Sequence, residues 1–138
     1  MKIQLLGIKQ GASNKTFGDL GINISGITKR LTVTPGKLFL NEENDQILIR
    51  PKVHFQVENG KKENIFSIES EYMVFFRLAE TDGQTPEQAL SANPDIVAKL
   101  HEYSKIAAGV HLQIELNLTA IDPDMPIWEG IYAAPSPN

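Results

Sequence analysis

The pair Asn59-Gly60 lies between two long runs of alternating apolar and polar residues, and this arrangement constrains the fold more than any other part of the chain. Residues 46–57 read QILIRPKVHFQV and residues 63–78 read ENIFSIESEYMVFFRL. A period of two over such lengths predicts β-strands that each bury one face. Asn-Gly favours a tight two-residue turn because both residues tolerate positive φ. The stretch therefore predicts a long antiparallel hairpin.

The turn also predicts how the two strands pair. With a two-residue loop, Val53 lies opposite Phe66 and Arg50 lies opposite Glu69. This register places the apolar residues of both runs on one face. It also predicts a cross-strand ion pair between Arg50 and Glu69 worth about a few tenths of a kcal/mol. Pro51 cannot donate a hydrogen bond to a neighbouring strand, so we expect an edge position or a β-bulge there.

The second strand is long for a chain of 138 residues. Sixteen residues span roughly 50 Å, whereas a compact domain of this size has a diameter somewhat under about 40 Å. The strand must therefore bend at a bulge, or project and be covered by another subunit. Apolar residues also occur on the face opposite the main core, which is typical of an oligomer contact or an apolar binding site. They are Leu48, Ile65, Met73 and Phe75. We predict a homo-oligomer.

The rest of the chain divides at its turn residues. Residues 2–9 predict a first strand that breaks at Gly11, and residues 11–39 predict a long crossing segment or short strands joined by turns. Thr85-Pro86-Glu87 is typical of a short capped helix. Asn93-Pro94-Asp95 opens a predicted helix from about 94 to 108. Residues 110–118 alternate like a strand but also extend the helical spacing, and both interpretations stay open.

Composition bounds the class of protein. The length predicts a single domain over residues 1–138, with a proline-rich tail loosely ordered from about residue 133. A net charge of −4 argues against binding to nucleic acid or to an anionic membrane surface. No window approaches the roughly 18 apolar residues of a membrane span, and the N-terminal apolar run is shorter than a signal-peptide core. There are no cysteines. We expect a cytoplasmic protein that does not insert into a membrane.

Candidate chemistry is sparse. His54, His101 and His111 do not form a metal-binding spacing, and the chain lacks a nucleophile elbow and a glycine-rich phosphate loop. Glu69 and Glu71 flank Ser70, which invites an acid/base interpretation, but the predicted ion pair with Arg50 is the simpler one. We therefore expect no catalysis, no cofactor and no metal.

The order of the segments resembles the SecB-like export chaperones. The resemblance is carried by KIQLLGIK at the start, by a long crossing segment and a long hairpin, by IFSI followed by a glutamate, and then by NPDIVAKLHEYSK and LQIELNLTAID. It covers most of the chain, although each motif is short. The resemblance implies an α+β fold with a four-stranded antiparallel sheet and one long and one short helix packed on one face. It also implies assembly as a dimer of dimers.

The same resemblance implies a function. SecB-like proteins hold unfolded precursor proteins in apolar grooves without ATP, and the export members deliver them to the SecA motor. The glutamate of that family that docks SecA corresponds to Glu69. The acids expected at the end of the first strand are replaced by Gln10 and Asn14, which leaves room for a different client, such as an antitoxin.

Residues predicted to contact clients come from the crossing segment, from the far face of the hairpin and from the tail. They are Phe17, Ile22, Ile24, Phe39, Ile65, Met73, Phe75 and Trp128.

Two other functions stay open. The chain is also consistent with a structural or assembly subunit of an oligomeric particle, in which the long hairpin packs against neighbouring copies. A small oligomeric enzyme is the third alternative, with an acid/base pair drawn from His54, Glu69 or Asp122. That alternative needs a deep pocket with a perturbed acid or base, which the sequence does not indicate.

Overall fold

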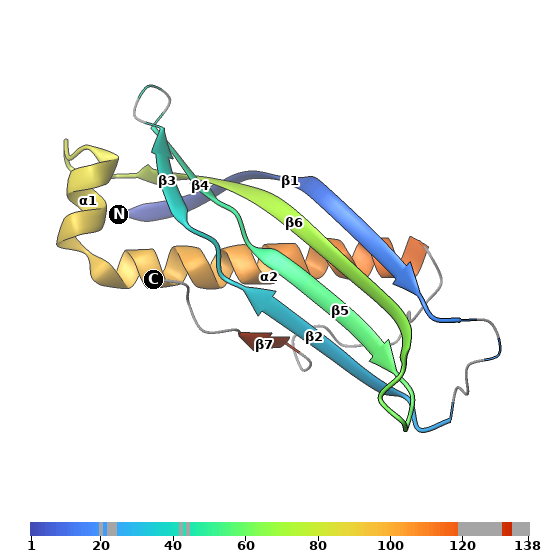
Figure 1. The fold of residues 1–138 in the computed structure, drawn as a ribbon. Coiled ribbons are helices and arrows are strands. Elements are labelled where there is room, and N and C mark those ends of the chain that lie inside the picture. The colour runs from blue at the N-terminus through green and yellow to red at the C-terminus, as the bar shows by residue number, and fades with distance from the viewer. Residues whose placement is uncertain (20, 22–24, 42, 44, 119–130, 134–138) are drawn as a thin grey trace.

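The computed structural model describes residues 1–19, 21, 25–41, 43, 45–118 and 131–133, and it consists of a long curved sheet covered on one face by a long helix (Figure 1). The strands are β1 (Lys2–Phe17), β2 (Thr28–Thr34), β3 (Leu38–Asn41), β4 (Gln46–Ile49), β5 (Lys52–Glu58), β6 (Asn64–Ala79) and β7 (Ile131–Ala133). The helices are α1 (Pro86–Ala92) and α2 (Pro94–Leu118).

Within the described residues the sheet has seven strands rather than the four that the resemblance implied. Their order is β3-β4-β6-β5-β2-β7, and β1 pairs with the other edge of β6 along its length. The number is larger because the first hairpin strand is split into β4 and β5, the crossing segment contributes β2 and β3, and β7 pairs in parallel with β2. The α+β class with two helices is confirmed.

The predicted hairpin is present, but its predicted register is wrong. Phe55 lies opposite Ile68 and Val57 lies opposite Phe66. The Asn59 side chain closes a longer loop, because its Oδ1 accepts hydrogen bonds from the backbone N–H groups of Lys61 at 3.0 Å and Glu63 at 2.9 Å. The register differs by an even number of residues, so the apolar faces remain as predicted.

Replacing Asn59 with alanine tests this loop. The change removes two hydrogen bonds that Asn59 Oδ1 accepts from backbone N–H groups. Asn59 is 3% exposed, so water does not readily replace these bonds. We expect Asn59→Ala to lower the free energy of unfolding by about 1–3 kcal/mol. Urea denaturation measures this, with Lys61→Ala in the same loop as the control. Equal stabilities of the two variants would contradict the proposed role of Asn59.

The strand break at Pro51 differs from both sequence predictions. Pro51 lies between β4 and β5, and both of these strands pair with β6 in the same register. Position 51 is therefore neither at a sheet edge nor at a β-bulge. The Pro51 carbonyl still accepts a hydrogen bond from the Tyr72 N–H at 3.0 Å. The chain from β2 to β3 crosses at the same place, since a Cβ added to Gly36 would lie 1.9 Å from the Arg50 carbonyl oxygen.

Replacing Gly36 tests this crossing. Gly36→Ala forces two backbone segments apart, and we expect a loss of about 3 kcal/mol in the free energy of unfolding, at the upper end of ordinary overpacking. Gly7→Ala is the matched control, because a Cβ added there meets nothing within 4 Å. Thermal melts of the two variants compare them; a normal melting temperature for Gly36→Ala would show that the crossing is wrongly placed.

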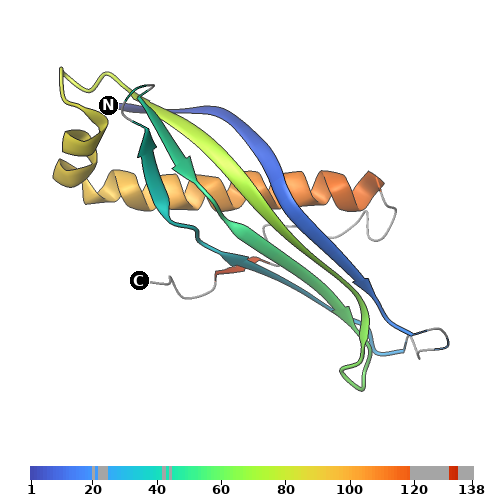
Figure 2. The same ribbon diagram turned by 45° about the horizontal axis from the view of Figure 1, so that its top comes forward.

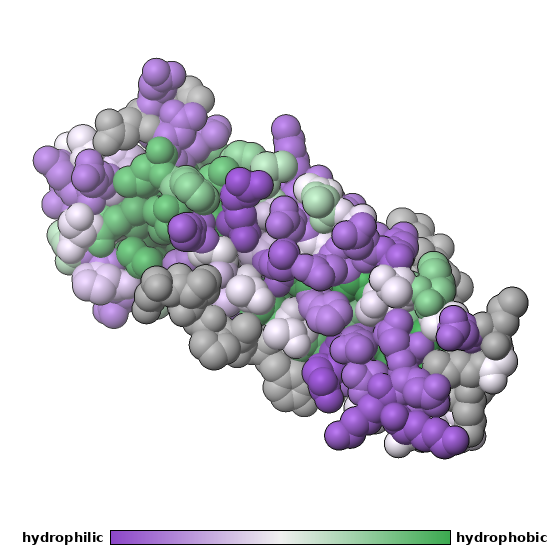
Figure 3. Space-filling view, in the orientation of Figure 1, coloured by the Kyte–Doolittle hydropathy of each residue, from purple (hydrophilic) through white to green (hydrophobic). Residues whose placement is uncertain are grey.

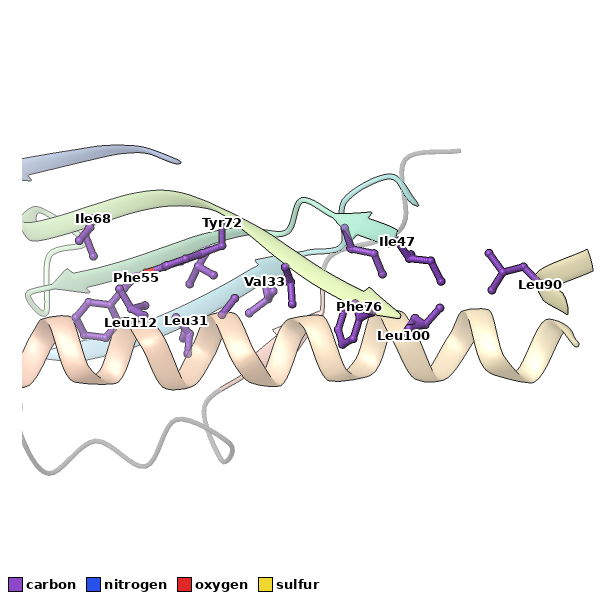
Figure 4. Packing of buried hydrophobic residues seen from close by; sticks show 14 of the residues in the cluster. Leu31, Val33, Ile47, Phe55, Ile68, Tyr72, Phe76, Leu90, Leu100 and Leu112 are labelled. Carbon is purple, nitrogen blue, oxygen red and sulfur yellow. The ribbon is translucent and has the colours of Figure 1, made fainter. Parts of the chain in front are cut away.

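The core lies between the sheet and α2, where side chains of both layers point toward one another (Figure 4). Tyr72, Phe55 and Phe76 are its largest fully buried side chains. Burial, and then the nearby Glu115 carboxylate, raises the pKa of the Tyr72 hydroxyl to about 12. The other members are mainly aliphatic residues of β2, β4, β5, β6, α1 and α2. The odd positions of β4 and β5 and the even positions of β6 supply this core, as the alternating pattern predicted.

Helix α2 settles the open question at residues 110–118. It runs without interruption through Gly109 to Leu118, so the extended-helix interpretation is the correct one. Helix α1 begins as predicted, with a capping box in which the Gln88 N–H donates to Thr85 Oγ1 at 3.2 Å and the Thr85 N–H donates to Gln88 Oε1 at 3.0 Å.

The first strand is longer than predicted. β1 continues past Gly11 to Phe17, with two irregularities in its pairing with β6, between Leu5 and Gly7 and between Gln10 and Ser13. These bulges shift the alternation so that Ile3, Leu5 and Ile8 all line the side that faces α2. In Figures 1 and 2 the hairpin end of β5 and β6 lies away from α2. The long strand therefore projects; that another subunit covers it stays a prediction.

Candidate functional site

An open apolar groove lies between β1 and α2. It has a volume of about 480 Å³ and is lined by Ile3, Leu5, Ile8, Phe76, Tyr103, Ile106, Ala107, Val110, His111 and Ile114. Several of these side chains are exposed, including Leu5 at 57% and Ile114 at 54%. We call this surface the β1–α2 groove. It is an apolar surface that the described part of the chain leaves uncovered.

The sequence contained a signal for the helical side of this groove. Tyr103, Ile106, Val110 and Ile114 follow one another at intervals of three and four residues, which places them in one stripe along a helix. Tyr103 and Val110 are both exposed. The core stripe is instead formed by Leu100, Ala108 and Leu112. Helix α2 therefore has two apolar faces, and the sheet covers one of them.

Polar side chains close one end of the groove. Glu115 accepts a hydrogen bond from Gln10 Nε2 at 3.1 Å and forms an ion pair with Lys15 Nζ at 3.5 Å. Ser13 and Ser70 share a hydrogen bond between their hydroxyls at 2.9 Å beside them. The contacts join α2 to β1 beyond the apolar part of the groove.

A second apolar surface crosses the opposite face of the sheet. Phe39 of β3 pairs with Leu48 of β4, Leu48 pairs with Phe75 of β6, and Phe75 pairs with Gly7 of β1 beside the bulged Leu6. We call Phe39, Leu48, Phe75 and Leu6 the far-face row. Figure 3 shows hydrophobic colour gathered toward the β3–β4 end of the molecule and hydrophilic colour over much of the hairpin end. A cavity of about 320 Å³ lies beside Leu6 and Phe75.

The predicted client contacts do not form one surface. Phe39 and Phe75 belong to the far-face row and Met73 follows on the same strand face, whereas Phe17 and Ile65 lie near the hairpin end. Phe17 is 68% exposed and its ring is 5.1 Å from that of Phe66. Ile22, Ile24 and Trp128 lie outside the described residues. The β1–α2 groove was missing from the predicted site.

Glu69 lies on the exposed face of β6 and contacts a different cation from the one predicted. Its carboxylate is 3.0 Å from Lys52 Nζ, while His54 is its cross-strand neighbour, so the predicted pair with Arg50 is wrong. The hydrogen bond and charge of Lys52 lower the pKa of Glu69. Of the residues named for an acid/base pair, Glu69 and His54 are both exposed, and Asp122 lies outside the described residues.

Comparison with known proteins supports the fold. No protein family model matches the chain, and no curated protein sequence matches it. A solved structure of a SecB-like chaperone of Mycobacterium tuberculosis, in complex with a ChAD peptide from the HigA1 antitoxin, is similar with a TM-score of 0.57. The match covers 90% of this chain and 88% of that chain at 14% sequence identity. The chain therefore has a SecB-like fold.

The structure also bears on membrane insertion. Among the described helices, neither α1 nor α2 combines the length and apolar character that a membrane-spanning helix requires.

Proposed function

We propose that this chain is a SecB-like holding chaperone that binds unfolded polypeptides without ATP and without catalysing a reaction. The observation that carries the proposal is the far-face row, in which apolar side chains from four strands form a surface that the described residues leave uncovered, on a SecB-like fold. Burial of apolar area is non-directional, so such a surface accepts many sequences.

The strength of one row suits transient holding. A client that covers about 300 Å² of apolar surface gains about 7–8 kcal/mol at about 25 cal/mol/Å². Association costs about 4–15 kcal/mol in lost freedom. One row is therefore a weak site, and firm holding requires several rows to act on the same client.

Assembly of several copies supplies those rows. The β1–α2 groove is an apolar surface that a neighbouring subunit would cover, since Leu5 and Ile114 are each more than half exposed in it. We propose a cytoplasmic homo-oligomer built as a dimer of dimers, with client binding shared among its subunits.

The destination of the client is the next part of the proposal. Delivery of precursors for export is the first alternative, with SecA docking at Glu69, which is exposed on the sheet. A toxin–antitoxin role is the second. It is favoured by Gln10 and Asn14, which stand where docking acids were expected, and by the antitoxin peptide bound to the structural neighbour.

Substitution at Glu69 separates these destinations. Glu69 is exposed and forms a surface ion pair with Lys52, so we expect Glu69→Arg to keep the fold and client binding. If the chain serves export, the variant loses at least tenfold in affinity for SecA, measured by biolayer interferometry. Lys52→Ala removes the same ion pair but keeps the acid, and is the control. No binding of SecA to the unchanged chain would remove the export alternative.

A structural or assembly subunit is the second candidate class. Among the strands of the described residues, β1 pairs with β6 alone. This favours the structural class, because an unpaired strand edge is a template for pairing with another chain. Rings or tubes on electron micrographs, without binding of unfolded protein, are the expected result for that class.

Binding of a permanently unfolded, fluorescently labelled polypeptide tests the chaperone proposal. We expect an increase in fluorescence anisotropy in buffer without nucleotide, unchanged when ATP is added. A native protein of similar size is the control and is expected to give no increase. Equal binding of the native control protein and of the unfolded polypeptide would contradict the proposal.

A further inference from the structure

We propose that the outer edge of β2 is a docking site for an extended segment of an unfolded polypeptide, and that β7 is an intramolecular stand-in that this segment displaces. The inference rests on the proposed function for the identity of the displacing strand. The exchange of β7 at the edge stands on the pairing of β2 with β7.

β7 covers only part of the edge on which it lies. β2 has seven residues and pairs with β5 along its inner edge. Within the described residues, β7 pairs along the outer edge with three of the seven, Leu31, Thr32 and Val33. Figures 1 and 2 both show β7 beside β2, on the side away from β5. A longer strand would therefore pair with more of β2 than β7 does.

The sequence of the tail limits how firmly β7 is held. β7 pairs with β2 in parallel, and a parallel ladder is slightly less stable per residue than an antiparallel one. Pro135 and Pro137 follow soon after Ala133, and proline cannot donate to a neighbouring strand. Three residues gain few hydrogen bonds against the conformational freedom that they lose. β7 is therefore more easily displaced than the longer antiparallel strands of the sheet.

The chemistry of the edge selects an extended polypeptide. An edge strand offers a row of backbone N–H and C=O groups, and another extended backbone matches their spacing whatever its side chains. Leu31 and Val33 are fully buried in the core, whereas Thr32 between them is half-buried. A strand added beside β2 alternates in the same way. Every second side chain of the added segment would then lie on the core side of the sheet, which favours segments with alternating apolar residues.

The covalent link of β7 to the rest of the chain sets a threshold for the client. A tethered strand has a high effective concentration at its own edge, so a competing strand must gain more contacts than the tether provides. A segment that pairs with all of Thr28–Thr34 gains more backbone pairs than the three of β7. While no client is bound, β7 also blocks the edge against pairing with the sheet of another molecule.

A disulfide between β2 and β7 tests the displacement, because the chain contains no cysteine. Thr32 and Tyr132 are partners in the pairing. Neighbouring strands lie about 4.7–4.9 Å apart, within the Cα–Cα range of a disulfide. We expect the double variant Thr32→Cys/Tyr132→Cys to form an intramolecular disulfide under mild oxidation and to run as a monomer on a non-reducing gel. No disulfide, or a disulfide-linked dimer, would overturn the assignment of this edge to the chain's own β7.

A second double variant is the matched control. Thr32→Cys/His54→Cys joins β2 to β5, its partner on the inner edge, and leaves the outer edge as it is. Both variants use position 32, and each oxidised protein is compared with its own reduced form. The comparison therefore separates the effect of the disulfide from that of the substitutions.

Hydrogen–deuterium exchange over residues 28–34 measures the opening of the edge. We expect slower exchange in the oxidised form of Thr32→Cys/Tyr132→Cys than in its reduced form, because the disulfide keeps β7 on β2. Equal exchange in the two forms would overturn the displacement, since β7 would then not leave the edge in the reduced protein.

Fluorescence anisotropy of the labelled unfolded polypeptide measures docking. We expect oxidation to weaken binding at least tenfold in the variant that joins β2 to β7, and to leave it unchanged in the variant that joins β2 to β5. Equal binding by the two forms of the first variant would overturn the edge as a client site. If the unchanged chain binds no unfolded polypeptide while exchange in β2 responds to the disulfide, the proposed function fails and the displaceable β7 stands.

Discussion

Replacing Phe75 with aspartate is expected to abolish most of the holding activity while leaving the fold in place. Phe75 is the centre of the far-face row, half-buried between Leu48 on one side and Gly7 on the other. The change removes about 2–3 kcal/mol of apolar burial by a client and adds a carboxylate that a client would have to desolvate. Since about 1.4 kcal/mol is a factor of ten, we expect client affinity to fall by at least ten- to one-hundredfold.

The control for Phe75→Asp lies on the same face of the same strand. Ser67→Asp adds the same charge on that face of β6 but lies near the hairpin end, outside the row. Far-UV circular dichroism and the melting temperature establish that both variants are folded, and anisotropy of the labelled unfolded polypeptide measures binding. A folded Phe75→Asp variant that binds as tightly as Ser67→Asp would exclude the row as the client surface.

The second large effect distinguishes helix from strand at residues 110–118. Leu112 is fully buried and Ile114 is 54% exposed, because residues that are two positions apart in a helix lie on different sides of it. In a strand the two would share one face. We expect Leu112→Ala to lower the free energy of unfolding by about 2–5 kcal/mol, and Ile114→Ala to change it by no more than about 0.5 kcal/mol.

The two alanine variants are compared at a low and at a higher protein concentration, so that any contribution of assembly to stability is separated from that of the single chain. Urea denaturation monitored by circular dichroism gives both free energies. Losses of similar size at the two positions would indicate a shared buried face and contradict the helix. The same comparison supports the second apolar stripe of α2, because that stripe exists only if these residues are helical.

The hairpin shows which parts of the fold local sequence can predict. Alternation placed Phe55, Phe66 and Phe76 on the buried face correctly, because a side-chain period of two is a local property of a strand. The register was wrong because the Asn59 side chain bonds the backbone of Lys61 and Glu63 and makes a longer loop than the Asn-Gly pair indicates. Two turn geometries that differ by an even number of residues keep the same faces, so the pattern could not choose between them.

The candidate site was harder to predict for a related reason. The bulges in β1 interrupt its alternation, so the shared side of Ile3, Leu5 and Ile8 is visible only after β1 is aligned with β6. The far-face row depends on pairing among four strands, and residues far apart in the chain, such as Phe39 and Phe75, become neighbours only through Leu48. The spacing of apolar residues in α2 indicated a second stripe, but which stripe is exposed depends on which side of the helix the sheet covers.

Suppression of aggregation without ATP is the measurement that tests the account most directly. A chemically denatured client is diluted into buffer with a several-fold excess of the assembled chain, and light scattering is followed with time. We predict that the unchanged chain strongly suppresses scattering without nucleotide. We predict that the Phe75→Asp variant leaves scattering high, whereas the Ser67→Asp variant suppresses it as the unchanged chain does. Scattering as high with the unchanged chain as with an inert protein at the same excess would contradict a holding function.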